Sequence, residues 1–321
     1  MDLSQIRRDA DHRLQEDTGS FPKLVLIHTA IAIGISLLLM LVNWLSSYIT
    51  PGGGLSNMDT QNLLSTGQVL LQLLIVIATP FWEAGLSFCA LQLLRSRQCN
   101  TNLTEGFRRW GPIAASLLIR GLIYFGVAVG CYFLCTIIVS FLPLPSWIME
   151  DLASFIATPT LPLNSGVRTF MAICALIYIV TLCIWLVPKL YMHRLVIYRI
   201  MDDKPCGGLQ AVLHSRILMK GHRKELFLLD LSFWWFYLLE LGIFILSAGN
   251  LLLSAMGIAL PLSDAVAAWV FPLIALLAYL ALHWLAKPKL EITYALFYRD
   301  IYEKGLKEAS AYQLDQPPQQ D

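Results

Sequence analysis

Long uncharged runs alternate with short clusters of charged residues along the chain, and the runs have the length of membrane-spanning helices. A bilayer core about 30 Å thick requires roughly 20 apolar residues in a helix, and backbone groups in lipid must be hydrogen-bonded within their own segment. Six runs meet this requirement: residues 24–49, 69–94, 113–142, 169–187, 226–253 and 265–286. The pattern predicts an all-α polytopic membrane protein, a bundle of about six transmembrane helices.

The basic residues lie on alternate sides of these spans. They cluster before the first span, between the second and third, between the fourth and fifth, and after the sixth. The intervening loops contain a single basic residue, Arg168, in residues 50–68, 143–168 and 254–264. Because short cytoplasmic loops carry the excess of lysine and arginine, both ends of the chain are expected in the cytoplasm. We expect the location to be a cytoplasmic (plasma) membrane.

Several cytoplasmic segments have an apolar stripe at helical spacing. Residues 3–14, 209–217 and 290–301 each carry such a stripe beside charged positions, which is typical of helices that lie in the membrane interface. Membrane lipids, with anionic headgroups at the cytoplasmic face, are the partners that this pattern favours. Residues 1–310 are predicted to form one membrane domain and residues 311–321 a disordered tail.

Composition narrows the class of function. The chain is 57% hydrophobic and 14% charged, which excludes an ordinary soluble domain. The seven cysteines include no CxxC pair, and no metal-site, nucleotide-binding or hydrolase motif is present, so we expect no cofactor, no metal and no catalytic residue. The basic loops follow the membrane surface, which favours lipid contact over nucleic acid.

One cytoplasmic stretch resembles a known family. The sequence SRILMKGHRKELFLLDLSFWW, residues 215–235, is similar to the signature of the DUF975 family of bacterial integral membrane proteins. The resemblance implies a membrane location without an assigned activity. Its motif positions here are Ser215, Met219, Lys220, Gly221 and Asp230.

Charged residues within the spans are the strongest candidates for a functional site, because burying a charge in a bilayer costs at least about 2.5 kcal/mol. Glu83 in the second span and Arg120 in the third fall in the inner half of the membrane, at depths that differ by roughly 6 Å. They predict either a salt bridge that locks two helices together or part of an ion, proton or headgroup site.

Other polar residues of the spans have two interpretations each. Glu240 lies roughly 21 Å into the fifth span and is either a neutral hydrogen-bonding group or a titrating transport residue. Asp230, one turn into that span, is expected to cap its N-terminus. His28 and His283, near the cytoplasmic ends of their spans, are expected to be interfacial or hydrogen-bonding residues rather than metal ligands.

These observations favour a membrane component that interacts with lipids or proteins without catalysis. A transporter of small solutes or lipids, using Glu83, Arg120 and Glu240, is the alternative. An intramembrane enzyme is the weaker alternative, because no motif supports it.

Overall fold

The computed structural model describes residues 2–17, 20–49, 58–96, 103–141, 165–203, 206–247 and 264–314, and all regular secondary structure in them is helical. The long apolar helices are α2 (Ser20–Ile49), α3 (Met58–Ser96), α5 (Trp110–Ser140), α7 (Ser165–Met192), α11 (Trp234–Ser247) and α13 (Asp264–Leu285). The remaining helices are α1 (Leu3–Glu16), α4 (Glu105–Arg108), α8 (Val196–Met201), α9 (Gly208–Leu218), α10 (Arg223–Ser232) and α14 (Lys287–Leu314).

The fold class predicted from the sequence is confirmed. Within the described residues, four helical segments are long and apolar enough to cross a membrane, and the number rises to six if each of two bent helix pairs is one span. One bent pair is α1 with α2, at 95°, and the other is α10 with α11, at 55°. The protein is therefore an all-α polytopic membrane protein.

The fifth predicted span, residues 226–253, is not one continuous helix. It is broken at Phe233, whose backbone N–H bonds the carbonyls of Asp230 and Leu231 and ends α10. The Phe233 side chain is buried, and α11 then begins at Trp234. The last residues of the predicted span, 248–253, lie outside the described residues.

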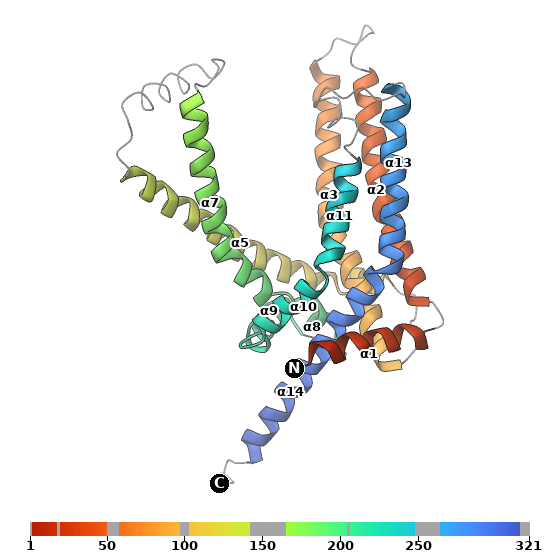
Figure 1. Ribbon diagram of the computed structural model, residues 1–321, viewed down its shortest axis with the longest axis vertical. Helices are drawn as coiled ribbons and strands as arrows, with labels where there is room; N and C mark the ends of the chain where they lie inside the picture. Colours follow the sequence, from red (N-terminus) through yellow and green to blue (C-terminus); the bar gives the residue numbers. More distant parts are fainter. Residues whose placement is uncertain are drawn as a thin grey trace.

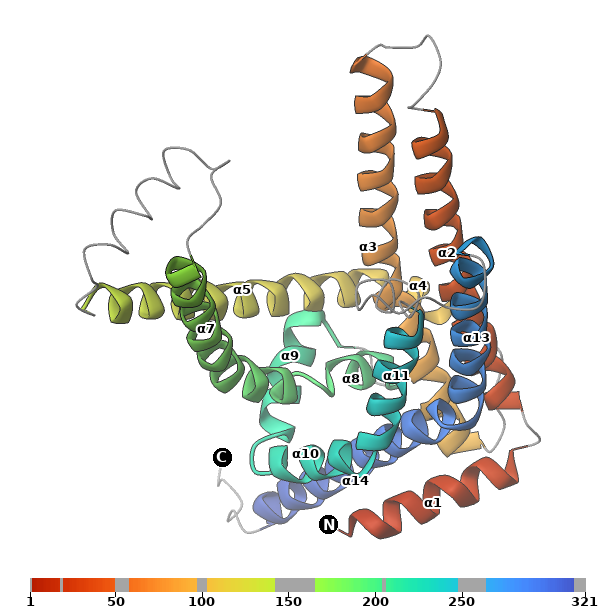
Figure 2. The same cartoon turned by 45° about the horizontal axis from the view of Figure 1, so that its top comes forward.

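The helices form two groups. Helix α2 packs between α3 and α13, and α13 also packs on α11, so these four helices form one cluster (Figure 1). Helices α5 and α7 pack on each other and diverge from this cluster in both views (Figures 1 and 2). Large apolar side chains of α5 such as Leu118 and Leu122 are about 70% exposed, as expected for surfaces that contact lipid hydrocarbon.

Both described ends of the chain lie at the same end of the molecule (Figure 1). There α1 packs along α14, with Ile6 and Ala10 buried and an ion pair of 2.7 Å between Lys289 and Asp11. Helix α14 was expected to lie in the membrane interface, but its apolar stripe faces the protein, because Phe297 and its apolar neighbours are buried in the protein core. The predicted tail of residues 311–321 begins inside α14, and residues 315–321 lie outside the described residues.

Helix α9 lies against α5, and one glycine permits the close approach. A Cβ atom at Gly208 would lie 2.5 Å from the Pro112 carbonyl oxygen and 2.7 Å from the Ser116 nitrogen. The other side of α9 is exposed, including Leu209 and Ile217. Helix α9 is thus held to α5 by its buried face and leaves its predicted apolar stripe partly uncovered.

Candidate functional site: a charged cavity among the helices

A cavity of about 740 Å³ lies where the α5–α7 pair meets the rest of the molecule. Its lining comes from α2, α3, α5, α7, α8, α10, α11 and α14, together with the turn between α7 and α8. The volume is within the roughly 300–1,000 Å³ usual for small-molecule sites. A partly open site with charged side chains is thus lined by helices, most of which are largely apolar.

The charges of the cavity are balanced. Three acidic and three basic side chains line it, namely Glu83, Asp230, Glu291, Arg120, Arg194 and Lys287. Two histidines, His28 and His193, also face it. The lining also includes the apolar side chains of Leu86, Leu117, Leu190 and Ile197. The cavity therefore offers both a charged and a hydrocarbon-like surface.

Two of the three acidic side chains accept hydrogen bonds from tyrosine hydroxyls. The Tyr294 hydroxyl donates to the Asp230 carboxylate, and the Tyr237 and Tyr294 hydroxyls are 3.1 Å apart. The Tyr198 hydroxyl donates to Glu291 over 3.3 Å. Glu83, the third acid of the cavity, accepts no hydrogen bond within the described part of the chain.

The three basic side chains of the cavity form no ion pair within the described residues. The Arg194 guanidinium lies over the Tyr294 ring, 4.8 Å from its centroid, and Arg120 Nε is 3.4 Å from the Ser116 carbonyl oxygen of its own helix. Among the described residues, neither arginine forms an ion pair, and Lys287 forms none either. The site therefore contains three cations that a bound anion could neutralise.

The structure places Glu83 and Arg120 in the same cavity, which is the neighbourhood expected from their depths. Within the described residues no ion pair joins them. The simple helix-locking salt bridge is therefore not formed, and the two groups face a shared polar space instead. His28 faces the same space, with its Nδ1 atom buried and without a hydrogen-bond partner.

Glu240 and His283 lie outside the lining of this cavity and contact each other. His283 Nε2 is 3.0 Å from a Glu240 carboxylate oxygen, and His283 Nδ1 is 3.1 Å from the Thr29 hydroxyl. Since α11 starts at Trp234, Glu240 is only six residues from the start of its helix, roughly 9 Å along the axis. The depth of roughly 21 Å assumed a continuous, straight fifth span, which the 55° bend between α10 and α11 does not provide. The contacts of His283 are those of a hydrogen-bonding residue.

Asp230 does not cap a helix N-terminus. It lies in the last turn of α10, and its carboxylate accepts the Tyr294 hydroxyl. The capping expectation assumed that the fifth span began near residue 226, whereas α10 begins at Arg223 and ends at Ser232.

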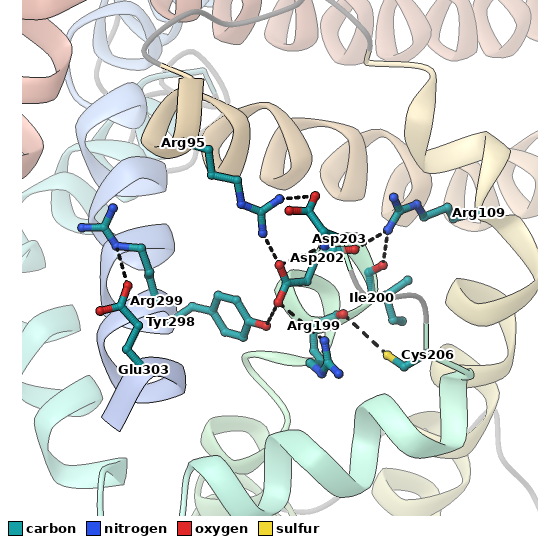
Figure 3. A network of polar contacts seen from close by, with 10 residues as sticks. All are labelled: Arg95, Arg109, Arg199, Ile200, Asp202, Asp203, Cys206, Tyr298, Arg299 and Glu303. Atoms are coloured by element: carbon teal, nitrogen blue, oxygen red, sulfur yellow. Dashed lines mark hydrogen bonds and ion pairs between the residues drawn. The ribbon is translucent and has the colours of Figure 1, made fainter. Parts of the chain in front are cut away.

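A second polar cluster ties the helix ends together near the termini (Figure 3). The Asp202 carboxylate pairs with Arg95 and Arg199 and accepts the Tyr298 hydroxyl at 2.7 Å. Arg109 donates to the carbonyl oxygens of Ile200 and Asp202 at 2.7 and 2.8 Å. These contacts join α3, α8 and α14 and the start of α5, so the cluster fixes the elements that carry the cavity.

The cluster includes a cysteine with a perturbed thiol. The Cys206 Sγ donates to the Arg199 carbonyl oxygen at 3.5 Å, and burial raises the pKa of this thiol above its ordinary value. A raised pKa keeps the thiol protonated at neutral pH, which argues against a reactive thiolate.

A family model described as a protein of unknown function, DUF975, matches residues 1–305 of the chain. The chain belongs to the DUF975 family. No curated protein and no solved structure matches this DUF975 protein. The resemblance noted in the sequence is thus confirmed over almost the whole chain. The fold and the site are described from this chain's own residues.

The motif residues of this DUF975 protein fall mainly in structural positions. The Ser215 hydroxyl donates to the Met192 carbonyl oxygen at 2.9 Å, and Met219 is fully buried. Gly221 has a φ of +93°, a left-handed conformation that glycine adopts without strain, and it follows the end of α9. Lys220 is exposed. Asp230 is the motif residue that lines the cavity.

In this DUF975 protein, no group of three or more histidine, cysteine or acidic residues in the described ranges has the arrangement of a metal site. The polar cavity residues that the sequence pattern does not single out include Arg194, Lys287, Glu291, Tyr198 and Tyr294. In the sequence pattern the basic ones belong to the positive loops that set membrane orientation, and Tyr294 belongs to an interfacial stripe. Their position could have indicated a site, because all five lie within about 12 residues of the end of a predicted span, where a helix can still reach the interior of the bundle.

Proposed function

We propose that this protein binds a membrane lipid, with the polar headgroup in the charged cavity and the acyl chains along the apolar helices. The observation that carries the proposal is the combination, in one cavity of a membrane protein, of an apolar lining and three cations that form no ion pair within the described residues. An amphiphile matches both surfaces at once, whereas a soluble ion would use only the charged one.

The apolar surfaces beside the cavity support this proposal. Leu118 and Leu122 flank the cavity residue Arg120 in α5 and are 70% and 71% exposed. On α7, Leu190 lines the cavity and is itself 44% exposed. An acyl chain that leaves the cavity along these helices would cover apolar surface and remain within the hydrocarbon layer.

The test is lipid retention by the purified full chain. The protein is extracted in mild detergent, and its bound lipids are identified by native mass spectrometry. We expect phospholipid on the wild-type protein and at least a tenfold loss of occupancy in the double variant Arg120→Gln and Arg194→Gln. The matched control is Arg299→Gln, an intermediate-exposure arginine of α14 outside the cavity lining. A wild-type protein that carries no lipid, or a double variant that retains it fully, would overturn the proposal.

Lipid transport is the second candidate, and the divergence of α5 and α7 from the other helices beside the cavity favours it (Figure 2). Reconstitution into liposomes with a fluorescently labelled phospholipid separates transport from binding. Transport predicts that a membrane-impermeant quencher bleaches inner-leaflet label faster with protein present, and that Arg120→Gln abolishes this acceleration. Binding without transport predicts no acceleration.

We further propose a bacterial plasma membrane, with both ends of the chain in the cytoplasm. The support is the alternation of basic loops together with the position of both described ends at one end of the molecule. Reporter fusions at residues 50–68 and at the carboxyl end test this orientation. A reporter that is active only outside the cytoplasm should work at the first site alone.

A further inference from the structure

We infer that the headgroup bound in the cavity carries both a phosphate and a primary amine, as in a phosphoethanolamine lipid. The inference rests on the lipid binding proposed above and names the class of headgroup. The cations Arg120, Arg194 and Lys287 receive the phosphate, and the Glu83 carboxylate receives the ammonium group.

The first argument is charge balance. The six charged side chains of the cavity are three acids and three bases, so a zwitterionic ligand leaves the filled site neutral, whereas an anionic headgroup adds a net charge within the membrane. Uncompensated charge in a low-dielectric region is costly. The site therefore favours a ligand with no net charge but with separated charged ends.

The second argument is the state of each charged group before binding. Arg120, Arg194 and Lys287 share the cavity with acids but form no ion pair with any of them among the described residues. Asp230 and Glu291 each accept a tyrosine hydroxyl, whereas Glu83 accepts no hydrogen bond from a described residue, so Glu83 is the cavity carboxylate with the most unused acceptor capacity in that part of the chain. A phosphate alone would be attracted by the cations and repelled by Glu83. An ammonium group on the same ligand turns this repulsion into a charge-assisted hydrogen bond.

The third argument concerns the type of amine. A primary ammonium has three N–H donors that a carboxylate can accept, while a quaternary ammonium has none. Glu83 therefore distinguishes ethanolamine from choline at the same phosphate. The tyrosine rings around the site contact an ammonium group of either kind, so they contribute affinity without this discrimination.

The experiment compares three phospholipids with identical acyl chains on the purified full chain. Phosphatidylethanolamine, phosphatidylcholine and phosphatidylglycerol are titrated separately, and the Kd of each is measured by native mass spectrometry. We expect phosphatidylethanolamine to bind at least tenfold tighter than the other two, because a charge-assisted hydrogen bond is worth about tenfold or more in affinity. In Glu83→Gln this preference should disappear while phosphatidylglycerol binds as well as before or better.

Retained phosphatidylglycerol binding shows that Glu83→Gln is folded. The matched control is Glu303→Gln, an exposed acid of α14 outside the cavity lining, which should keep the preference. Equal affinity of the wild-type protein for phosphatidylethanolamine and phosphatidylcholine overturns the inference and leaves lipid binding intact. An unchanged preference in Glu83→Gln has the same consequence. Absence of binding to all three lipids overturns both proposals.

A last arm separates a lipid from a soluble headgroup. Free phosphoethanolamine should displace phosphatidylethanolamine only weakly, because it lacks the acyl chains that contact the apolar helices. Displacement at concentrations as low as those of the lipid itself would identify a soluble ligand and overturn the lipid assignment.

Discussion

Replacing Gly208 by alanine should push α9 away from α5. The added Cβ would lie 2.5 Å from the Pro112 carbonyl oxygen, 2.7 Å from the Ser116 nitrogen and 2.8 Å from the Ala115 Cβ. Ordinary van der Waals contact begins near 3.4 Å, so the helices must separate by about 0.9 Å, and two of the three obstructing atoms belong to the backbone and cannot rotate away.

Overpacking of this kind costs about 1–3 kcal/mol, and the better helix propensity of alanine returns about 0.5–1 kcal/mol. A net loss of about 1 kcal/mol should lower the Tm by roughly 2–4 °C. The assay is thermal unfolding of the purified full chain in detergent, followed by tryptophan fluorescence.

The matched control is Gly111→Ala in α5, where a Cβ would meet no atom within 4 Å. Its Tm should stay the same or rise slightly. If Gly208→Ala unfolds at the same temperature as the wild-type protein, or if both variants lose stability equally, then the close approach of α9 to α5 does not limit this position.

Two further predictions concern the polar cluster of Figure 3. Tyr298→Phe removes the hydroxyl that donates to the buried Asp202 carboxylate at 2.7 Å and should cost about 1.5–3 kcal/mol in unfolding free energy, measured in the same thermal assay. Tyr132→Phe, at an exposed tyrosine of α5, is the control that should leave the Tm unchanged, and a Tyr298→Phe variant as stable as this control would contradict the argument. Burial raises the pKa of the Cys206 thiol, so the thiolate fraction at neutral pH is low. Alkylation of Cys206, followed by peptide mass spectrometry, should therefore accelerate only at a higher pH than alkylation of free cysteine, whose pKa is about 8.5. A midpoint at or below that of free cysteine would argue against this environment.

The spans were predictable because hydrocarbon imposes a length requirement that composition reveals directly. The break at Phe233 was not, since no proline or glycine marks it and it depends on the burial of the Phe233 ring. Because of this break, Glu240 lies in the middle of a 14-residue helix, α11, where it contacts His283. A residue's depth in a span is therefore only as reliable as the continuity of the helix.

The candidate site was predictable in part for a different reason. Glu83 and Arg120 were recognisable because each is an isolated charge inside an apolar run, and both line the cavity. Arg194 and Lys287 were not, because a basic residue at the end of a span has the same sequence pattern whether it faces water or the bundle interior. Only the packing of α8 and α14 distinguishes the two cases.

The contact between Tyr298 and Asp202 has a consequence for how the protein is made. The two residues are 96 positions apart, so at a synthesis rate of roughly 5–20 residues per second the ribosome needs about 5–20 s to add Tyr298 after Asp202. During that interval Asp202 can pair with Arg95 and Arg199, which are already synthesised, but the hydroxyl from α14 is missing. The polar cluster is completed only after the last apolar helix has left the ribosome, and formation of the cavity beside it must end with the docking of α14.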